Sequence, residues 1–238
     1  MRSILATILG NLTLFVASMV FGVLAMIAGQ IPPRGEWVVP VARAWARCLL
    51  WSAGVRLEKS FEEDPDPRQR YVFMANHQSL YDIPVLLAAL PVSFRFLAKA
   101  SLFKIPIFGW SLSAAGFVPV DRKQRGRASE VFSKALGALE GGASLVIFPE
   151  ETRSLDGRLK PFQRGRFLMA LKSGMPIVPV GIHGTLGIRR KGSLRIEPGV
   201  VKVSIGRPIE VSEYGLRRKA ELIDTTTREV GRLAGIDS

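Results

Sequence analysis

The sequence predicts an α/β domain with a mixed central sheet flanked by helices, preceded by an apolar membrane-anchoring helix or helical hairpin. Two observations lead to this prediction. Short apolar runs of strand length alternate with segments whose apolar residues recur at helical spacing, which is the pattern of a layered α/β domain. Before them, residues 3–33 contain no charged side chain. We therefore expect N-terminal membrane-anchoring helices at residues 1–58 and a second domain at residues 59–238.

The apolar run at residues 4–31 is long enough to span a bilayer, which takes about 20 residues. A cleaved signal peptide usually has an apolar region of only ~7–15 residues, and a buried helix of a soluble protein rarely reaches this length without a charge. The sequence therefore favours a membrane anchor. A second stretch, residues 37–53, places Arg43 and Arg47 on one helical face among tryptophans. It suits either the headgroup boundary or an amphipathic helix on the domain core, and the two stretches together also fit a re-entrant hairpin.

The formal net charge is +13, from 33 Lys and Arg against 20 Asp and Glu. Such an excess indicates an anionic partner, which can be a nucleic acid, a membrane surface or a phosphorylated substrate. Charge beside the apolar run also predicts orientation, because the more cationic flank faces the cytoplasm. Arg2 and the amino terminus precede the run, whereas five cations follow it within residues 34–59. We therefore expect a membrane-bound protein with its main domain on the cytoplasmic face, as at the inner membrane of a bacterium.

The few cysteine and histidine residues exclude some classes of site. Cys48 is the only cysteine, so no intrachain disulfide can form, which fits a reducing compartment. The two histidines are His77 and His183, so a Cys/His zinc site is not expected. The basic charge is not accompanied by a zinc-finger or base-stacking motif, and nucleic-acid binding is therefore not expected.

The remaining chain reads as alternating strands and helices after a polar loop at residues 61–70. Strands are expected at residues 71–75, 94–98, 116–120, 144–148 and 177–182, and a hairpin is expected from residues 194–197 and 201–205. Helices are expected at residues 83–90, 127–139, 165–172 and 216–230, with a short helix or loop around residues 104–110. Asp82 is a suitable N-cap for the first of these helices.

A histidine and an aspartate lie close in sequence where the expected strand 71–75 ends. Residues 76–82 read NHQSLYD. His77 is the side chain best suited to accept a proton near neutral pH. In a continuous helix, a side chain five residues on would point elsewhere, so Asp82 reaches His77 only if His77 lies in the preceding turn. The carboxylate would then accept Nδ1–H and orient the ring. The alternative is that the two residues only cap the turn and the helix.

A second polar segment, FPEETRS at residues 148–154, follows the clearest buried strand. Glu150 and Arg153 are neighbours in this turn. The planar guanidinium of arginine matches phosphate oxygens and can bind them in a bidentate manner. The alternative is an ordinary surface turn with an ion pair.

With two further blocks, these segments resemble the glycerolipid acyltransferases typified by 1-acyl-glycerol-3-phosphate acyltransferase. The four blocks occur in order and together span about half of the chain: NHQSLYD at 76–82, a block from Lys99 to FVPVDR at 117–122, FPEETRS at 148–154 followed by PFQRG at 161–165, and IVPVGI at 177–182. The sequence departs from the family at Glu151, where the family usually has Gly. If that position requires a positive φ, Glu is strained there.

The resemblance implies that a fatty acyl group moves from a thioester to the sn-2 hydroxyl of 1-acyl-glycerol-3-phosphate, giving phosphatidic acid. His77 would be the general base and Asp82 would orient it. The residues implied in substrate binding are Glu150, Thr152, Arg153, Lys99 and Arg122. No cofactor is implied; acyl-coenzyme A or acyl carrier protein would be the co-substrate, and the bilayer and a lipid acceptor would be the partners.

Other activities stay open at this point. The acceptor can be another lysophospholipid, or a lyso-aminolipid that lacks the phosphate. A thioester hydrolase would use water in place of the hydroxyl. A membrane-binding or nucleic-acid-binding module without catalysis is permitted by the basic charge alone.

Overall fold

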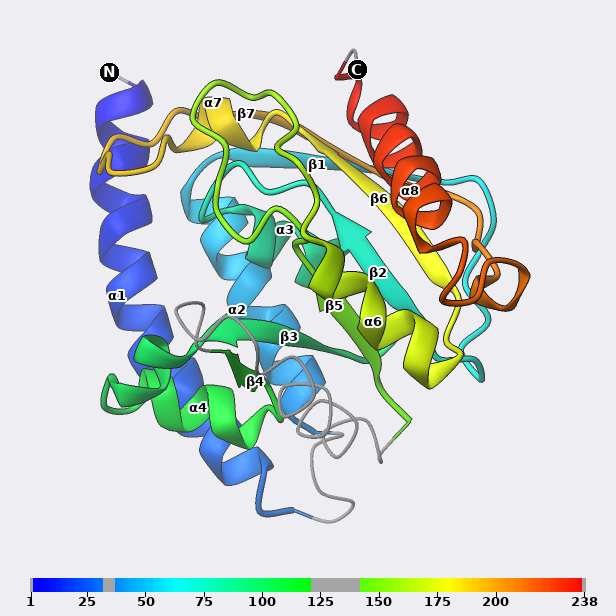
Figure 1. The fold of residues 1–238 in the computed structure, drawn as a ribbon. Helices are drawn as coiled ribbons and strands as arrows, with labels where there is room; N and C mark the ends of the chain where they lie inside the picture. The colour runs from blue at the N-terminus through cyan, green and yellow to red at the C-terminus, as the bar shows by residue number, and fades with distance from the viewer. Residues whose placement is uncertain (1, 32–36, 121–141, 237–238) are drawn as a thin grey trace.

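The computed structural model describes residues 2–31, 37–120 and 142–236. Its centre is a seven-stranded sheet with the order β1-β7-β6-β2-β5-β3-β4, and helices cover both faces (Figure 1). The strands are β1 (Val55–Phe61), β2 (Val72–Ala75), β3 (Phe94–Lys99), β4 (Val118–Val120), β5 (Ser144–Ile147), β6 (Ile177–His183) and β7 (Gly199–Ile205). The helices are α1 (Arg2–Ala28), α2 (Val38–Ser52), α3 (Asp82–Ala89), α4 (Phe108–Ala114), α6 (Arg164–Ser173), α7 (Thr185–Ile188) and α8 (Lys219–Ala234), with 3-10 turns η1 (Ala100–Lys104) and η2 (Val211–Glu213).

The sheet is mixed, which confirms the predicted fold class. Neighbouring strands run parallel except β6 and β7, which pair antiparallel. At the centre, Phe73 of β2 lies opposite Val146 of β5 and Val178 of β6. All four residues of β2 are buried, as expected for a strand covered by helices on both faces.

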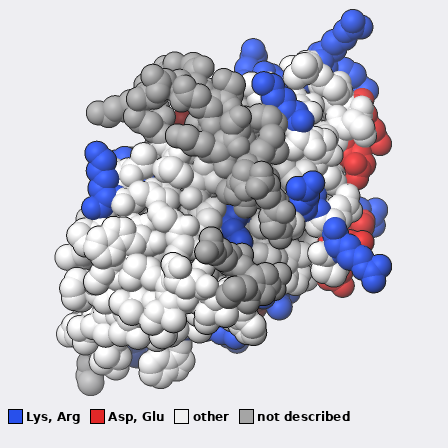
Figure 2. All heavy atoms as spheres, turned by 90° about the horizontal axis from the view of Figure 1, so that it is seen from below, with Lys and Arg blue, Asp and Glu red and all other residues white. Residues whose placement is uncertain are grey.

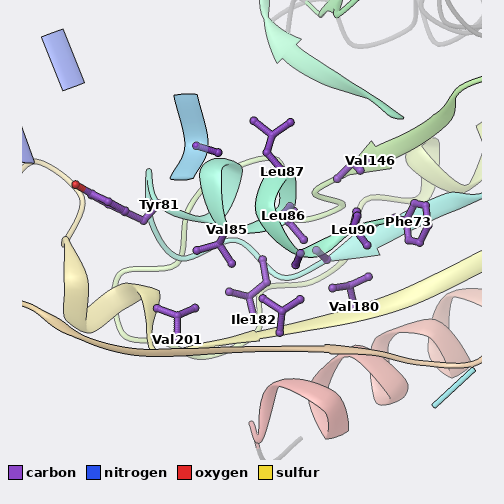
Figure 3. Packing of buried hydrophobic residues seen from close by; sticks show 14 of the residues in the cluster. Phe73, Tyr81, Val85, Leu86, Leu87, Leu90, Val146, Val180, Ile182 and Val201 are labelled. Carbon is purple, nitrogen blue, oxygen red and sulfur yellow. The ribbon is translucent and has the colours of Figure 1, made fainter. Parts of the chain in front are cut away.

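Alternate side chains of β2 point into two separate cores, because successive residues of a strand face opposite sides of the sheet. Phe73 packs in the cluster that contains α2 and α3, whereas Met74 packs in the cluster that contains α6 and α8. Figure 3 shows the first core, in which Val85 of α3 points toward Ile182 and Val201 of the sheet. The packing against the sheet therefore holds α3, including its first residue, in a fixed place.

Helix α1 packs against the rest of the protein along its length rather than standing apart from it. Near its start, the Thr7 hydroxyl donates to the Ile196 carbonyl (3.2 Å) and accepts from the Ile196 amide (3.0 Å). In its middle, Ser18 Oγ accepts from Trp45 Nε1 of α2 (3.2 Å), and its later turns contact α4. By length and composition, α1 is able to cross a membrane. The helices α1 and α2 also pack on each other as a helical hairpin (Figure 1).

The outer face of α1 is apolar and exposed. Its large exposed side chains include Ile4, Leu5, Ile8, Leu12, Phe15, Val20 and Ile27. Figure 2 looks at the molecule from the side of α4. The half of this face near α1 and α4 carries few charged side chains, whereas most of the charged side chains gather toward the opposite half. A large exposed apolar surface of this kind is typical of a region that contacts a membrane or a partner.

Three expectations about secondary structure need correction. Residues 194–197 do not form a hairpin with β7, since the backbone of Ile196 pairs with Thr7 of α1 and β7 pairs with β6 and β1. Strand β1 was not expected, because its sequence VRLEKSF contains three charged residues, Arg56, Glu58 and Lys59, whereas the expected strands were apolar runs. Asp82 is the first residue of α3 and not its N-cap, which is Tyr81.

Two further expectations concern the helix at residues 127–139 and the domain boundary. The helix expected at residues 127–139 lies outside the described residues. The expected boundary between residues 58 and 59 falls within β1, which joins the central sheet beside β7. We propose that the second domain starts with β1, at Val55.

Gly181 of β6 tests the packing of α8 on the sheet. An added Cβ would lie 2.1 Å from the Leu233 carbonyl carbon and 2.2 Å from the Ala234 nitrogen. Gly181→Ala should therefore destabilise the protein by ~3 kcal/mol or prevent folding. The control is Gly165→Ala in α6, where a Cβ meets nothing within 4 Å. Alanine favours the helix, so this change should raise the free energy of unfolding by ~0.5–1 kcal/mol. Thermal unfolding in detergent measures the melting temperatures of wild type and of both variants. A Gly181→Ala variant that melts at the same temperature as wild type would contradict this packing.

Candidate active site

The loop after β2 begins with an asparagine that continues the sheet. The Asn76 side chain donates from Nδ2 to the Ile182 carbonyl (2.8 Å) and accepts at Oδ1 from the Ile182 amide (2.7 Å). Both hydrogen bonds are those that a backbone neighbour of β6 would make. The amide group thus replaces one rung of the ladder, and the main chain leaves the sheet at His77.

Asp82 draws this loop into a tight turn around one carboxylate oxygen. Its Oδ2 lies 2.7 Å from His77 Nδ1 and accepts from the backbone amides of Gln78 (2.7 Å) and Ser79 (2.9 Å). Because a carboxylate only accepts, Nδ1 must carry the proton and the other ring nitrogen, Nε2, is left free of it. The Asp82 side chain is completely buried. The two residues that the sequence placed five apart are therefore paired, in the arrangement that orients a general base.

The turn that follows β5 holds the backbone of His77 from the other side. Glu150 Oε1 accepts from the His77 amide (2.7 Å), and the His77 carbonyl accepts from the Ser154 amide (2.8 Å). Glu150 Oε2 accepts from the Lys160 amide (3.0 Å). Both oxygens of this buried carboxylate are thus used by backbone groups. Glu150 therefore fixes the position of the His77 backbone by a hydrogen bond. Its expected part in substrate binding stays a prediction.

The imidazole of His77 stacks on Phe148 and borders a large cavity. The two ring centroids are 4.1 Å apart with an interplanar angle of 17°. The cavity has a volume of about 580 Å³ and extends from His77 between α1, α2, α3 and α4. Its apolar lining comes mostly from these helices and includes Phe21, Trp45 and Leu87. The cavity therefore suits an apolar ligand that reaches the histidine.

The structure brings some of the other expected site residues to this cavity. Lys99, at the end of β3, and Arg153 both line it together with His77. Thr152 does not line the cavity; its hydroxyl accepts from Lys160 Nζ (3.2 Å) instead. Arg122 lies outside the described residues. Two cations therefore share the cavity with the base, as binding of an anionic group requires.

Glu151 has a positive φ, the conformation that would strain a glutamate at this position. Its φ is +60°, and among the described residues other than glycine only Ile107 is also positive. This conformation costs an L residue roughly 1–2 kcal/mol. The side chain of Glu151 pairs with Arg166, whose Nε donates to Oε1 (2.8 Å) and whose Nη2 lies 2.7 Å from the same oxygen in an ion pair. The expected strain at Glu151 is present, and an ion pair accompanies it.

Three features of the site were not identified from the sequence. The stacking of Phe148 on His77 had a partial signal, because Phe148 belongs to the FPEETRS segment. The hydrogen bond from Lys160 to Glu150 had none, since it comes from the backbone. The pairing of Asn76 with Ile182 joins residues 106 positions apart, and a single sequence does not show which distant strand accepts a side chain.

Comparison with known proteins identifies relatives for most of the chain. The model of the family described as Acyltransferase matches residues 56–183. A chloroplastic 1-acyl-sn-glycerol-3-phosphate acyltransferase of Brassica napus is 37% identical over 177 residues, which are 74% of this chain and 51% of that protein. The protein of the same description from Pseudomonas aeruginosa is 29% identical over 221 residues, or 91% of this chain and 85% of that protein. This chain spans about half the length of the plant relatives that it matches.

One solved structure has the same fold over the full length of both chains. It is the crystal structure of the 1-acyl-sn-glycerophosphate acyltransferase PlsC from Thermotoga maritima, with a TM-score of 0.83, 24% sequence identity and 100% of each chain covered. At this level of identity, the likeness shows a shared fold.

The ionisation of Glu150 predicts a pH-dependent stability. Burial raises the pKa of its carboxyl to about 7 from 4.5, against the lowering effect of the hydrogen bonds from His77 and Lys160. The folded protein then binds more protons than the unfolded chain between these values. This contribution to the free energy of unfolding is complete below pH 4.5 and is lost as the pH rises through about 7.

The test compares wild type with Glu150→Gln, whose amide does not titrate. The melting temperature of wild type minus that of the variant should fall between about pH 5 and pH 8. Taking the difference removes the contribution of all other groups that titrate equally in both proteins. A constant difference across this range would contradict the raised pKa of Glu150.

Proposed function

The chain belongs to the Acyltransferase family, and we propose that it transfers a fatty acyl group from a thioester to the free hydroxyl of 1-acyl-glycerol-3-phosphate, giving phosphatidic acid. The acyl donor is acyl-coenzyme A or acyl carrier protein, which offer the same thioester. The observation that carries the proposal is the position of His77, which is oriented by Asp82 and lines an apolar cavity together with Lys99 and Arg153. The cavity suits a fatty chain, and the two cations suit a phosphate.

His77 Nε2 removes the proton from the acceptor hydroxyl as that oxygen attacks the thioester carbonyl carbon. The new carbon–oxygen bond forms and the carbonyl π electrons move to its oxygen. When this intermediate collapses, the carbon–sulfur bond breaks and the imidazolium returns its proton to the leaving thiolate. Asp82 is a positioning residue, because it holds Nδ1–H and stabilises the imidazolium.

This mechanism needs no covalent acyl-enzyme intermediate. Ser79 is the hydroxyl nearest to His77 in the NHQSLYD segment, but its Oγ donates to the Arg189 carbonyl (2.7 Å) and the side chain is fully buried. Ser79 is absent from the cavity lining. This supports direct attack by the acceptor over a covalent intermediate at this serine.

The exposed apolar face of α1 supports a position of the protein at a membrane. The acceptor and the product both partition into a bilayer, and the exposed apolar face of α1 lies beside the helices that line the cavity. Because the domain packs along α1 through contacts such as Thr7 with Ile196, we propose that this helix and the domain sit together at the cytoplasmic face. Basic residues near the surface add attraction to anionic lipids of ~1 kcal/mol each.

Replacing His77 tests the reaction and its base together. Purified protein is incubated in detergent or vesicles with labelled lysophosphatidic acid and oleoyl-coenzyme A, and then with oleoyl acyl carrier protein. Phosphatidic acid should form with wild type, and His77→Ala should lower the rate by about 10²–10⁴-fold. Wild-type activity in His77→Ala would exclude this mechanism. Free oleate in place of phosphatidic acid would identify a thioester hydrolase.

Replacing Arg153 tests the acceptor phosphate. Arg153→Ala should raise the acceptor KM by about 10–100-fold, because a charge-assisted hydrogen bond to phosphate is lost, and should change kcat and the donor KM little. Arg158→Ala is the control, since it removes an exposed cation of the same loop that does not line the cavity. An unchanged acceptor KM in Arg153→Ala would show that the phosphate binds elsewhere.

A further inference from the structure

The turn that carries Arg153 also carries two adjacent carboxylates with different surroundings. Glu150 uses both oxygens for the His77 and Lys160 amides. Glu151 has a positive φ of 60°, unlike its neighbours in the turn. Its amide donates to the Phe148 carbonyl (3.0 Å), while its side chain extends toward α6. Glu151 therefore brings a second negative charge to the turn that holds the phosphate-binding arginine.

Arg166 meets this charge from the first turn of α6. Its Nε donates to Glu151 Oε1 (2.8 Å), and its Nη2 forms an ion pair with the same oxygen (2.7 Å). The side chain of Arg166 is 14% exposed and that of Glu151 is 29% exposed, so water screens this pair less than a surface ion pair. The pair lies at a small hollow shared with Leu97 and Phe148, apart from the large cavity.

The geometry around this pair also fixes the position of the turn. The Gln163 amide, just before α6, donates to the Pro149 carbonyl (2.9 Å). The start of α6 is thus tied to the turn by one backbone hydrogen bond and one ion pair. Without Arg166, the carboxylate of Glu151 would lose this cationic partner, and it lies two residues along the chain from Arg153. Arg153 would then be drawn to Glu151 and away from the cavity.

We propose that Arg166 is a positioning residue for the acceptor: by binding Glu151, it keeps the guanidinium of Arg153 available to the acceptor phosphate. The inference rests on the proposed function. It assigns to Arg166 an effect on acceptor affinity that acts through the charge of Glu151. Removing that charge must therefore cancel the effect of losing Arg166, which a purely structural role of Arg166 would not produce.

The test is a double-mutant cycle with steady-state kinetics for acceptor and donor. Arg166→Met should raise the acceptor KM by about tenfold, and the donor KM and kcat should stay within about twofold of wild type. Glu151→Gly suits the positive φ and removes the charge, and its acceptor KM should lie within about threefold of wild type. The double variant should return to the acceptor KM of Glu151→Gly.

Two further variants keep the test decisive. Arg164→Met removes an exposed cation from the same helical turn and should leave the acceptor KM within about twofold of wild type. If Arg166→Met does not fold, Arg166→Gln replaces it with the same expected rise. An acceptor KM in the double variant as high as in the single Arg166 variant would overturn the inference, as would no rise in the single variant. No acyl transfer by wild type would instead contradict the proposed function itself.

Discussion

One oxygen atom, Asp82 Oδ2, accepts hydrogen bonds from the His77 ring and from the backbone amides of Gln78 and Ser79. It is buried beneath the loop between β2 and α3, where an unpaired charge would be costly. The three donors hold the carboxylate in place, and the carboxylate in turn sets the loop and the ring. The position of the base thus depends on a single acceptor whose own place is fixed by α3 and the core beneath it.

A second constraint comes from the turn after β5, which binds the His77 backbone at both its amide and its carbonyl. The same turn carries Arg153 into the cavity and Glu151 toward Arg166. His77 and Arg153, the proposed base and the proposed phosphate ligand, are therefore placed by one connected network rather than by independent loops. The cavity that they border is built by α1 to α4, so α1, which carries the exposed apolar face, also lines the space proposed for the acyl chain. In the proposed function, membrane contact and substrate binding use the same part of the protein.

The sequence predicted the buried strands well because their apolar runs are continuous, as in β2 and β5. It missed β1, whose charged residues mask the strand pattern and whose partner β7 is distant in sequence. It suggested His77 and Asp82 from their spacing but left their pairing open, because the pairing depends on where the chain leaves the sheet. That point is set by Asn76 and Ile182, 106 residues apart. The residue types of the site were predictable, whereas contacts made by backbone groups, such as that of Lys160 with Glu150, were not.

Nitrogen NMR of the imidazole rings shows whether Asp82 fixes the proton on Nδ1 and leaves Nε2 of His77 free to act as the base. The chain has only two histidines, so ¹⁵N-histidine labelling with a His183→Gln variant assigns both. We predict that neutral His77 carries its proton on Nδ1 in wild type and loses the preference for this tautomer in Asp82→Asn. A proton on Nε2 in wild type, or no change in the Asp82 variant, would contradict it.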